Sequence, residues 1–244
     1  MQLFISDTYE DMSRQAADDV ISFMQSIQQP LICTASGDSP AGLYKEIVRR
    51  AKKKEADVSD WSFVGLDEWR GLNGDDEGSC RYYLDQQLFQ PLGIHQKHIC
   101  FFNGRATDAE SECRQTEDFI QSHGGINVAV VGLGLNGHVG MNEPGTSLSL
   151  RSHVADIDSS TQQAGQKYFK KAQVLTEGLT LGLANLLDTH QIFLLVSGIH
   201  KADILKRVLE EEPSDQLPAS LLRKHPGLRI YADKPAASMI ERTS

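Results

Sequence analysis

The chain has 244 residues, of which 40% are hydrophobic and 23% charged, and its formal net charge is −9. This balance is typical of a soluble globular protein, and the acidic charge argues against sequence-independent nucleic-acid binding, which needs a basic surface. No stretch approaches the ~18 apolar residues of a membrane span, so we expect neither a nucleic-acid nor a membrane partner.

The N-terminus and the cysteines indicate a cytoplasmic protein. Residues 1–12 carry acids where a secretory signal would need a basic and then an apolar run. The four cysteines form no CxxC pair, so we expect free thiols in a reducing compartment. The length suffices to bury one substantial core, and no repeat or linker interrupts it. We therefore predict a single domain spanning 1–244.

Apolar runs alternate with amphipathic stretches along nearly the whole chain. The predicted strands are 3–6, 30–36, 61–67, 98–102, 126–134, 191–198 and 228–233. The predicted helices lie near 9–28, 41–54, 77–90, 107–123, 178–188 and 199–211. Continuous apolar runs such as Val128–Val131 indicate strands covered on both faces. The alternation predicts an α/β fold, a single doubly wound and mostly parallel sheet flanked by helices, with a less regular region at 140–177 that includes a candidate lid near 155–177.

Ligands of such sheets bind beyond the carboxyl ends of the strands, which selects four loops. The first, TASGDSPAGLYKEI, brings Ser36, Gly37 and Ser39 to the start of a predicted helix. Hydroxyl groups and unpaired backbone N–H groups at a helix N-terminus suit a phosphate. The same residues also fit an ordinary N-cap at Ser39, and the two interpretations are compatible. Asp38 must point away from any phosphate bound here.

The second loop, FVGLDEWRGL, ends a predicted strand on two adjacent acids, Asp67 and Glu68. Adjacent side chains on an extended segment diverge, so one acid can enter the pocket while the other holds the loop. A carboxylate beside apolar surface has a raised proton affinity, which suits a general base near neutral pH. A solvated strand end with a helix-capping acid is the competing interpretation.

The third loop, INVAVVGLGLNGHVGMNEPG, contains the glycine spacing of a dinucleotide site at Gly132, Gly134 and Gly137. That fingerprint needs a helix to begin within the motif, but Pro144 interrupts any helix soon afterwards. We therefore interpret the glycines as a sharp turn that brings His138 and a carboxylate into an acid–base pair. A turn held by a hydrogen-bonded histidine is the alternative.

The fourth loop, VSGIHKADIL, places Lys201 at the start of a helix directly after a strand. A cation at this place opposes the helix dipole, and facing a bound anion would explain it. For a single lysine, plain surface exposure is the competing interpretation.

The order of these signals resembles the glucosamine-6-phosphate deaminase/isomerase family, which shares a Rossmann-like superfamily with 6-phosphogluconolactonase. The likeness runs from the first predicted strand to residue 226, and its most specific part is GHVGMNEPG. The segments LDEW, GSC at 78–80 and QPLG at 90–93 look closer to the galactosamine-6-phosphate branch.

The resemblance implies an enzyme that opens a hexosamine 6-phosphate, isomerises it and hydrolyses the ketose imine to a ketose 6-phosphate and ammonia, without a metal or cofactor. In this family, His138, oriented by Glu143, would open the ring, and Asp67 would shift the proton between C2 and C1. The residues that the resemblance assigns to substrate and phosphate are Ser36, Gly37, Ser39, Glu68, Gly137, Lys167 and Lys201.

The chain departs from the family pattern at three places. Asn136 stands where some members have an aspartate. An asparagine can orient the ring but cannot take up and release a proton. Lys167 replaces an arginine that grips the phosphate, which exchanges a two-pronged contact for a point charge. His153 and Ala155 stand where allosteric hexameric relatives bind an activator through basic residues, so we predict no activation by an N-acetyl-hexosamine phosphate.

Three other functions compete with the deaminase. A 6-phosphogluconolactonase also uses a Gly-His loop, but NEP after the histidine and the LDEW acids disfavour it. A sugar-phosphate sensor normally carries a DNA-binding helix-turn-helix, for which a first strand at residue 3 leaves no room. A nucleotide-dependent dehydrogenase rests on the glycine spacing alone. The residues fit either hexosamine epimer, and a monomer or a small homo-oligomer.

Overall fold

The computed structural model describes residues 1–240 of the chain. A parallel sheet forms the centre of the molecule. Within these residues, seven strands lie in the order β1-β10-β9-β6-β2-β3-β5, and every neighbouring pair is parallel. Their bounds are β1 Gln2–Ser6, β2 Leu31–Thr34, β3 Ser62–Gly65, β5 Ile99–Cys100, β6 Val128–Gly132, β9 Gln191–Val196 and β10 Leu228–Asp233. The predicted doubly wound α/β fold is confirmed.

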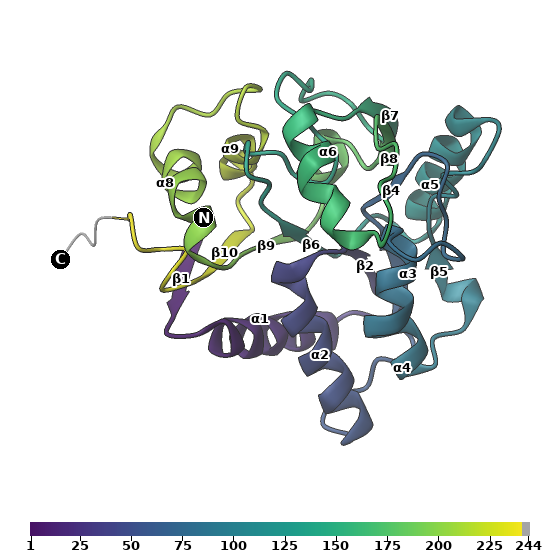
Figure 1. Ribbon diagram of the computed structural model, residues 1–244. Coiled ribbons are helices and arrows are strands. Elements are labelled where there is room, and N and C mark those ends of the chain that lie inside the picture. Colours follow the sequence, from purple (N-terminus) through teal and green to yellow (C-terminus); the bar gives the residue numbers. More distant parts are fainter. Residues whose placement is uncertain (241–244) are drawn as a thin grey trace.

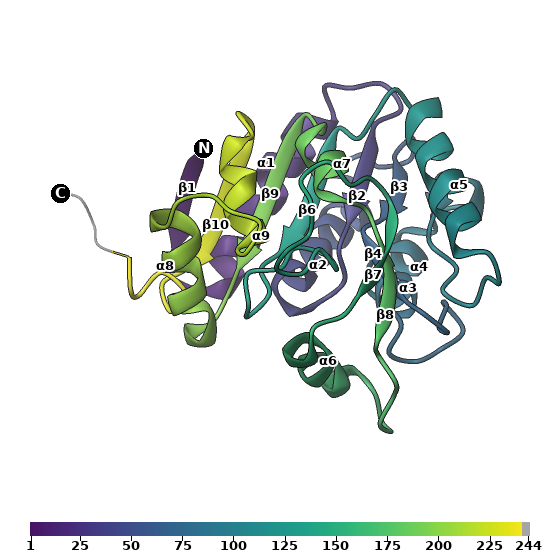
Figure 2. The same ribbon diagram turned by 90° about the horizontal axis from the view of Figure 1, so that it is seen from above.

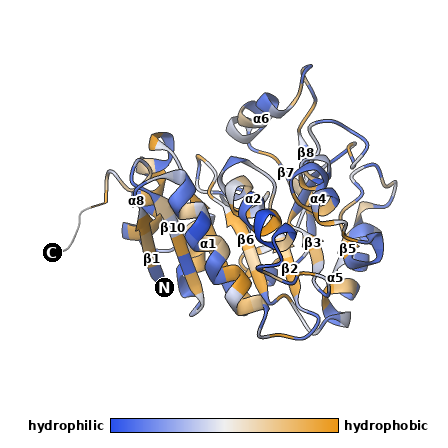
Figure 3. Ribbon diagram, turned by 90° about the horizontal axis from the view of Figure 1, so that it is seen from below, coloured by the Kyte–Doolittle hydropathy of each residue, from blue (hydrophilic) through white to orange (hydrophobic). Residues whose placement is uncertain are grey.

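Helices cover both faces of this sheet (Figure 1). On one face lie α1 Tyr9–Met24, α2 Asp38–Lys52, α3 Cys80–Leu84, the π-helical turn η1 Asp85–Phe89 and α4 Gln90–Leu92. On the other face lie α5 Ala109–Ser122, α7 Leu183–Leu187, α8 Ala202–Glu210 and α9 Pro218–Leu221. The central strands of the sheet are mostly hydrophobic and the outer parts of the helices are mostly hydrophilic (Figure 3), as expected for a sheet that is covered on both faces.

Short 3-10 turns complete the helical elements. Their bounds are η2 Gln96–His98, η3 Gln166–Tyr168, η4 Ile199–Lys201 and η5 Leu222–Lys224.

Helix α1 shows how the local sequence determines an element. The Thr8 side chain caps it by accepting from the Asp11 N–H, and two acids in its first turn favour the helix dipole. Met12, Ala16 and Val20 repeat at helical spacing and are fully buried against the sheet.

A second, three-stranded antiparallel sheet packs at the carboxyl end of the first and corrects two predictions. Its order is β4-β8-β7, with β4 Asp67–Trp69, β8 Glu177–Thr180 and β7 His153–Asp156. The predicted strand 61–67 is therefore two strands, because the chain leaves the large sheet after Gly65. The predicted helix 178–188 is wrong in its first part, since residues 177–180 pair with β4 and β7 on both sides.

The candidate lid falls on residues 157–176, between β7 and β8, which we call the lid segment. It contains α6 Ser159–Gly165 and η3. Figure 2 shows α6 projecting away from the large sheet, apart from the other helices. Leu175 from this segment packs with Trp69 and Cys80 in a small separate core.

Candidate functional site

A cavity of about 250 Å³ lies where the loops after β2, β6 and β9 meet β4 and the lid segment. The predicted site residues that line it are Ser36, Gly37, Ser39, Asp67, His138, Lys167 and Lys201. They come from distant parts of the sequence and converge because parallel strands end at one edge of the sheet. Asn136, Glu143, Glu68 and Gly137 lie outside its lining.

One end of the cavity collects groups that attract an anion. Helix α2 begins there at Asp38, after Gly37 with φ of 120°, a conformation that glycine adopts without strain. The helix starts earlier than predicted, so Ser39 lies in its first turn and is not the N-cap. The Ser39 hydroxyl pairs with that of Ser197 at 3.0 Å. Unpaired N–H groups of the first turn thus meet two hydroxyl groups at this end.

Lys201 supplies positive charge to the same end of the cavity. Its Nζ donates to the backbone carbonyl of Leu133 at 2.6 Å, which fixes the ammonium inside the cavity. Burial lowers the pKa of Lys201 to about 8, and the nearby Lys167 adds to this effect. The lysine is therefore charged at neutral pH, and its ammonium group contacts a carbonyl instead of a carboxylate. An anion in the cavity would compensate this buried charge.

Asp67 is the carboxylate that faces the cavity. It is the first residue of β4 and lines the cavity, and its side chain is only partly exposed. Burial raises its pKa to about 6, and a hydrogen bond with the Cys80 thiol opposes this rise. A base with this pKa is ionised at neutral pH and still binds a proton firmly, as proton transfer to and from carbon requires.

Glu68 points away from the cavity, so a substrate contact for it does not fit the structure. Its side chain is fully buried and accepts the backbone N–H groups of Trp69, Cys80 and Arg81 at 2.9 to 3.0 Å. Burial nevertheless raises the pKa of Glu68 to about 7 against the effect of these amides. One acid of the pair enters the pocket and the other holds the loop, because alternate strand residues face opposite sides.

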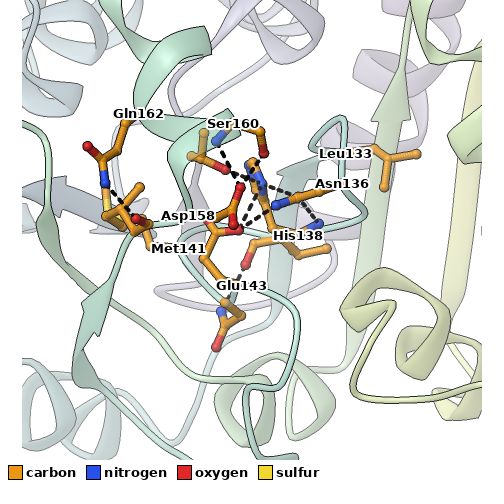
Figure 4. A network of polar contacts seen from close by, with 12 residues as sticks. Leu133, Asn136, His138, Met141, Glu143, Asp158, Ser160 and Gln162 are labelled. Carbon is orange, nitrogen blue, oxygen red and sulfur yellow. Dashed lines mark hydrogen bonds and ion pairs between the residues drawn. The ribbon is translucent and has the colours of Figure 1, made fainter.

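His138 is held from behind by a network that includes Asn136, Glu143 and Thr161 (Figure 4). The Asn136 amide donates to Glu143 Oε2 at 2.7 Å, and its Oδ1 lies 2.7 Å from His138 Nδ1. Glu143 itself lies 3.6 Å from Nδ1. The amide thus stands between the carboxylate and the imidazole, and Glu143 orients His138 mainly through it.

The network determines which ring nitrogen carries the proton. A carboxylate only accepts, so Asn136 turns its NH₂ group to Glu143 and its oxygen to His138. Nδ1 therefore carries the hydrogen, and Nε2 is left with a lone pair for the cavity. Burial lowers the pKa of His138, with Glu143 opposing this effect, so the neutral ring is favoured.

The glycine-rich loop serves the histidine and not a nucleotide. Residues 133–152 form turns and one isolated bridge, Val139–Asn142, with no helix to face a pyrophosphate. A Cβ on Gly134 would lie 2.3 Å from the His138 ring, so only glycine leaves the ring its place. Gly137 uses its N–H in the turn to Gly134 and packs against Leu217, which leaves the predicted substrate contact without support.

Lys167 reaches the cavity from the lid segment and pairs there with Asp38, Nζ to Oδ2 at 2.6 Å. Asp38 therefore lines the cavity and turns toward a cation, where the sequence predicted only that it avoid a phosphate. Burial lowers the pKa of Lys167, but Asp38 and Tyr168 together outweigh this effect and leave the pKa raised.

Sequence reasoning missed several cavity residues. They are Cys80, Tyr83, Thr161, Tyr168, Ser197 and His200. Tyr168 and His200 each adjoin a predicted lysine, so the neighbours of those lysines were the available signal. Thr161 had none, because a threonine in a polar helix is indistinguishable from a surface residue.

Two features of the described residues bear on metal and membrane binding. Within residues 1–240, no three or more His, Cys, Asp and Glu side chains cluster as a metal would require. In the same part of the chain, every helix is too short or too polar to cross a membrane.

Comparisons with known proteins agree with the motifs. The family model described as glucosamine-6-phosphate isomerases/6-phosphogluconolactonase matches residues 7–230. A glucosamine-6-phosphate deaminase of Oceanobacillus iheyensis is 36% identical over 237 residues, 97% of this chain and 95% of that protein. One of Clostridium perfringens is 33% identical over 242 residues, 99% of this chain and all of that protein.

Solved structures show the same relationship. A monomeric glucosamine-6-phosphate deaminase superimposes with a TM-score of 0.94 at 33% identity, covering 98% of this chain and all of the other. A 6-phosphogluconolactonase from Leishmania guyanensis reaches 0.77 at 18% identity, covering 98% of each chain, which shows the shared fold alone. The resemblance stated from the motifs is confirmed, and the chain belongs to the family of glucosamine-6-phosphate isomerases and 6-phosphogluconolactonases.

Proposed function

We propose that this chain is a hexosamine-6-phosphate deaminase, which converts an amino sugar phosphate and water to the ketose 6-phosphate and ammonia. The observation that carries the proposal is the meeting of Asp67, His138 and Lys201 in one cavity. Relatives named as glucosamine-6-phosphate deaminases along the whole chain support it.

The phosphate would bind at the start of α2, against Ser36, Gly37 and Ser39, with Lys201 as its main cation. Both the helix N-terminus and the buried ammonium favour an anion there. Binding energy from this remote group would then orient the reacting end of the sugar.

His138 would open the sugar ring. Its Nε2 lone pair, left free by the Asn136 hydrogen bond at Nδ1, can take the proton of the C1 hydroxyl and return it to the ring oxygen. The imidazolium formed in between is stabilised by Glu143 through the intervening amide.

Asp67 would carry out the isomerisation. Its carboxylate removes the proton from C2 of the open aldehyde and delivers it to C1, while O1 gains a proton and the amine nitrogen loses one, so the aldehyde becomes an alcohol and the C2 amine becomes a ketose imine. Water then adds to the imine carbon and ammonia leaves. A group with a pKa of about 6 serves both directions of the transfer, and such acid–base catalysis is worth about 10²- to 10⁴-fold in rate.

Glucosamine 6-phosphate is the substrate we propose first, because the curated relatives at 33% to 36% identity are named for it. The segments LDEW, GSC and QPLG make galactosamine 6-phosphate the second candidate. Both epimers give ammonia through the same steps and differ only at C4.

A lactone hydrolase and a sensor without turnover are the competing functions. The acid that faces the cavity at Asp67 serves enolisation and has no necessary part in opening a lactone. An assay of ammonia and ketose phosphate with both hexosamine phosphates, beside 6-phosphogluconolactone hydrolysis, separates the three. We expect ammonia and ketose 6-phosphate in equal amounts without lactone turnover. Lactone turnover alone, or tight binding of the sugar phosphates without a product, would contradict the proposal.

A further inference from the structure

The ion pair between Asp38 and Lys167 spans the anion-binding end of the cavity. Asp38 is the first residue of α2, whereas Lys167 lies in η3 of the lid segment, so the pair joins two elements distant in sequence. Lys167 also lies over the Tyr168 ring, with Nζ 4.9 Å from its centroid. Both paired side chains are more than half exposed.

This pair lowers the positive charge of the end that would receive the phosphate. Two lysines, Lys167 and Lys201, line it, and Asp38 faces the first of them. The Asp38 charge also reaches Lys201, since it raises the pKa of Lys201 against the larger effect of burial. The Asp38 carboxylate repels a phosphate that binds at this end. The phosphate also competes with Asp38 for the ammonium group of Lys167.

We propose that Asp38 determines the affinity of the phosphate subsite by holding Lys167 in an ion pair, so that a phosphate monoester must displace the Asp38 carboxylate to gain this second cation. The inference rests on the proposed function only through the phosphate subsite. It makes Asp38 a specificity-determining residue, because a weakly charged ligand cannot displace the carboxylate.

The strength of the pair predicts the size of the effect. Exposed ion pairs contribute little to stability, so phosphate can break this one. Removing the carboxylate charge frees Lys167 and removes a like charge beside the anion, and we expect phosphate to bind about threefold to tenfold more tightly.

Calorimetric titration with inorganic phosphate tests this in the whole protein. The variants are Asp38→Asn, Lys167→Gln and the double variant, with Glu77→Gln as the matched control. Glu77 pairs with Lys170 of the lid segment at 2.9 Å, and neither residue lines the cavity. Asp38→Asn should lower the Kd for phosphate and Lys167→Gln should raise it, whereas Glu77→Gln should leave it unchanged.

The double variant decides whether Asp38 acts through Lys167. If it does, most of the gain from Asp38→Asn disappears in the Lys167→Gln background. An equal gain in both backgrounds, an unchanged Kd in Asp38→Asn, or no phosphate binding by any of the proteins would overturn the inference. Since the titration involves no turnover, a failed ammonia assay would refute the proposed reaction and leave this result standing.

Discussion

The side-chain amide of Asn136 links His138 to Glu143 by two hydrogen bonds. Asn136 donates a hydrogen bond to Glu143 Oε2 and accepts one from His138 Nδ1, each at 2.7 Å. Glu143 Oε2 and His138 Nδ1 themselves are 3.6 Å apart. The chain therefore orients its histidine through an uncharged amide, whereas an aspartate at residue 136 would place a further carboxylate directly against the ring.

Replacing Asn136 by aspartate should change the titration of His138. A second carboxylate beside the ring favours the imidazolium, so the pKa of His138 rises and the neutral base forms only at higher pH. NMR titration of the ring in wild type and Asn136→Asp measures this directly. Equal titration of His138 in the two proteins would show that the amide does not govern its charge.

The pH dependence of kcat/KM should follow two groups in the cavity. Activity rises as pH increases through about 6, because Asp67 must lose its proton to act as a base. It falls above about 8, because Lys201 loses the charge that binds the phosphate. Initial rates at subsaturating substrate between pH 5 and 9 test this. A kcat/KM that neither falls below about pH 6 nor falls above about pH 8 would contradict the assignment.

Glu68 should matter for stability. Glutamine keeps its shape but turns an NH₂ group toward one of the three backbone N–H donors, so we expect Glu68→Gln to lower the free energy of unfolding by about 1–3 kcal/mol. Urea unfolding measures the change. The exposed Glu77→Gln variant is the control and should stay within about 0.5 kcal/mol of wild type. Similar values for the two variants would mean that the buried carboxylate does not hold the loop.

An N-acetyl-hexosamine 6-phosphate should leave the substrate saturation curve unchanged. In the structure, Ala155 is buried in β7 and the Nδ1 atom of His153 contacts the Arg151 carbonyl, so neither position holds a lysine or arginine side chain that could grip the phosphate of an activator. Initial rates with and without the acetylated sugar check this. A leftward shift of the curve would refute it.

The sequence predicted the large sheet because its strands are continuous apolar runs, and it predicted most of the cavity because ligands bind at the carboxyl ends of such strands. It could not predict the small sheet, since the pairing of residues 177–180 with β4 and β7 depends on distant partners. For the same reason, the strand pattern alone could not tell which acid of the Asp67–Glu68 pair faces the cavity, and only the family resemblance assigned the base to Asp67. The contact of Thr161 with His138 arises only from the placement of the lid segment.

The most direct test of the account is ammonia release from glucosamine 6-phosphate by Asp67→Asn at saturating substrate, with substrate binding measured separately. Asparagine keeps the shape of the side chain but cannot accept the C2 proton, so the account predicts binding close to that of wild type and a loss of at least about 10²-fold in kcat. Turnover near the wild-type rate would show that another group moves this proton.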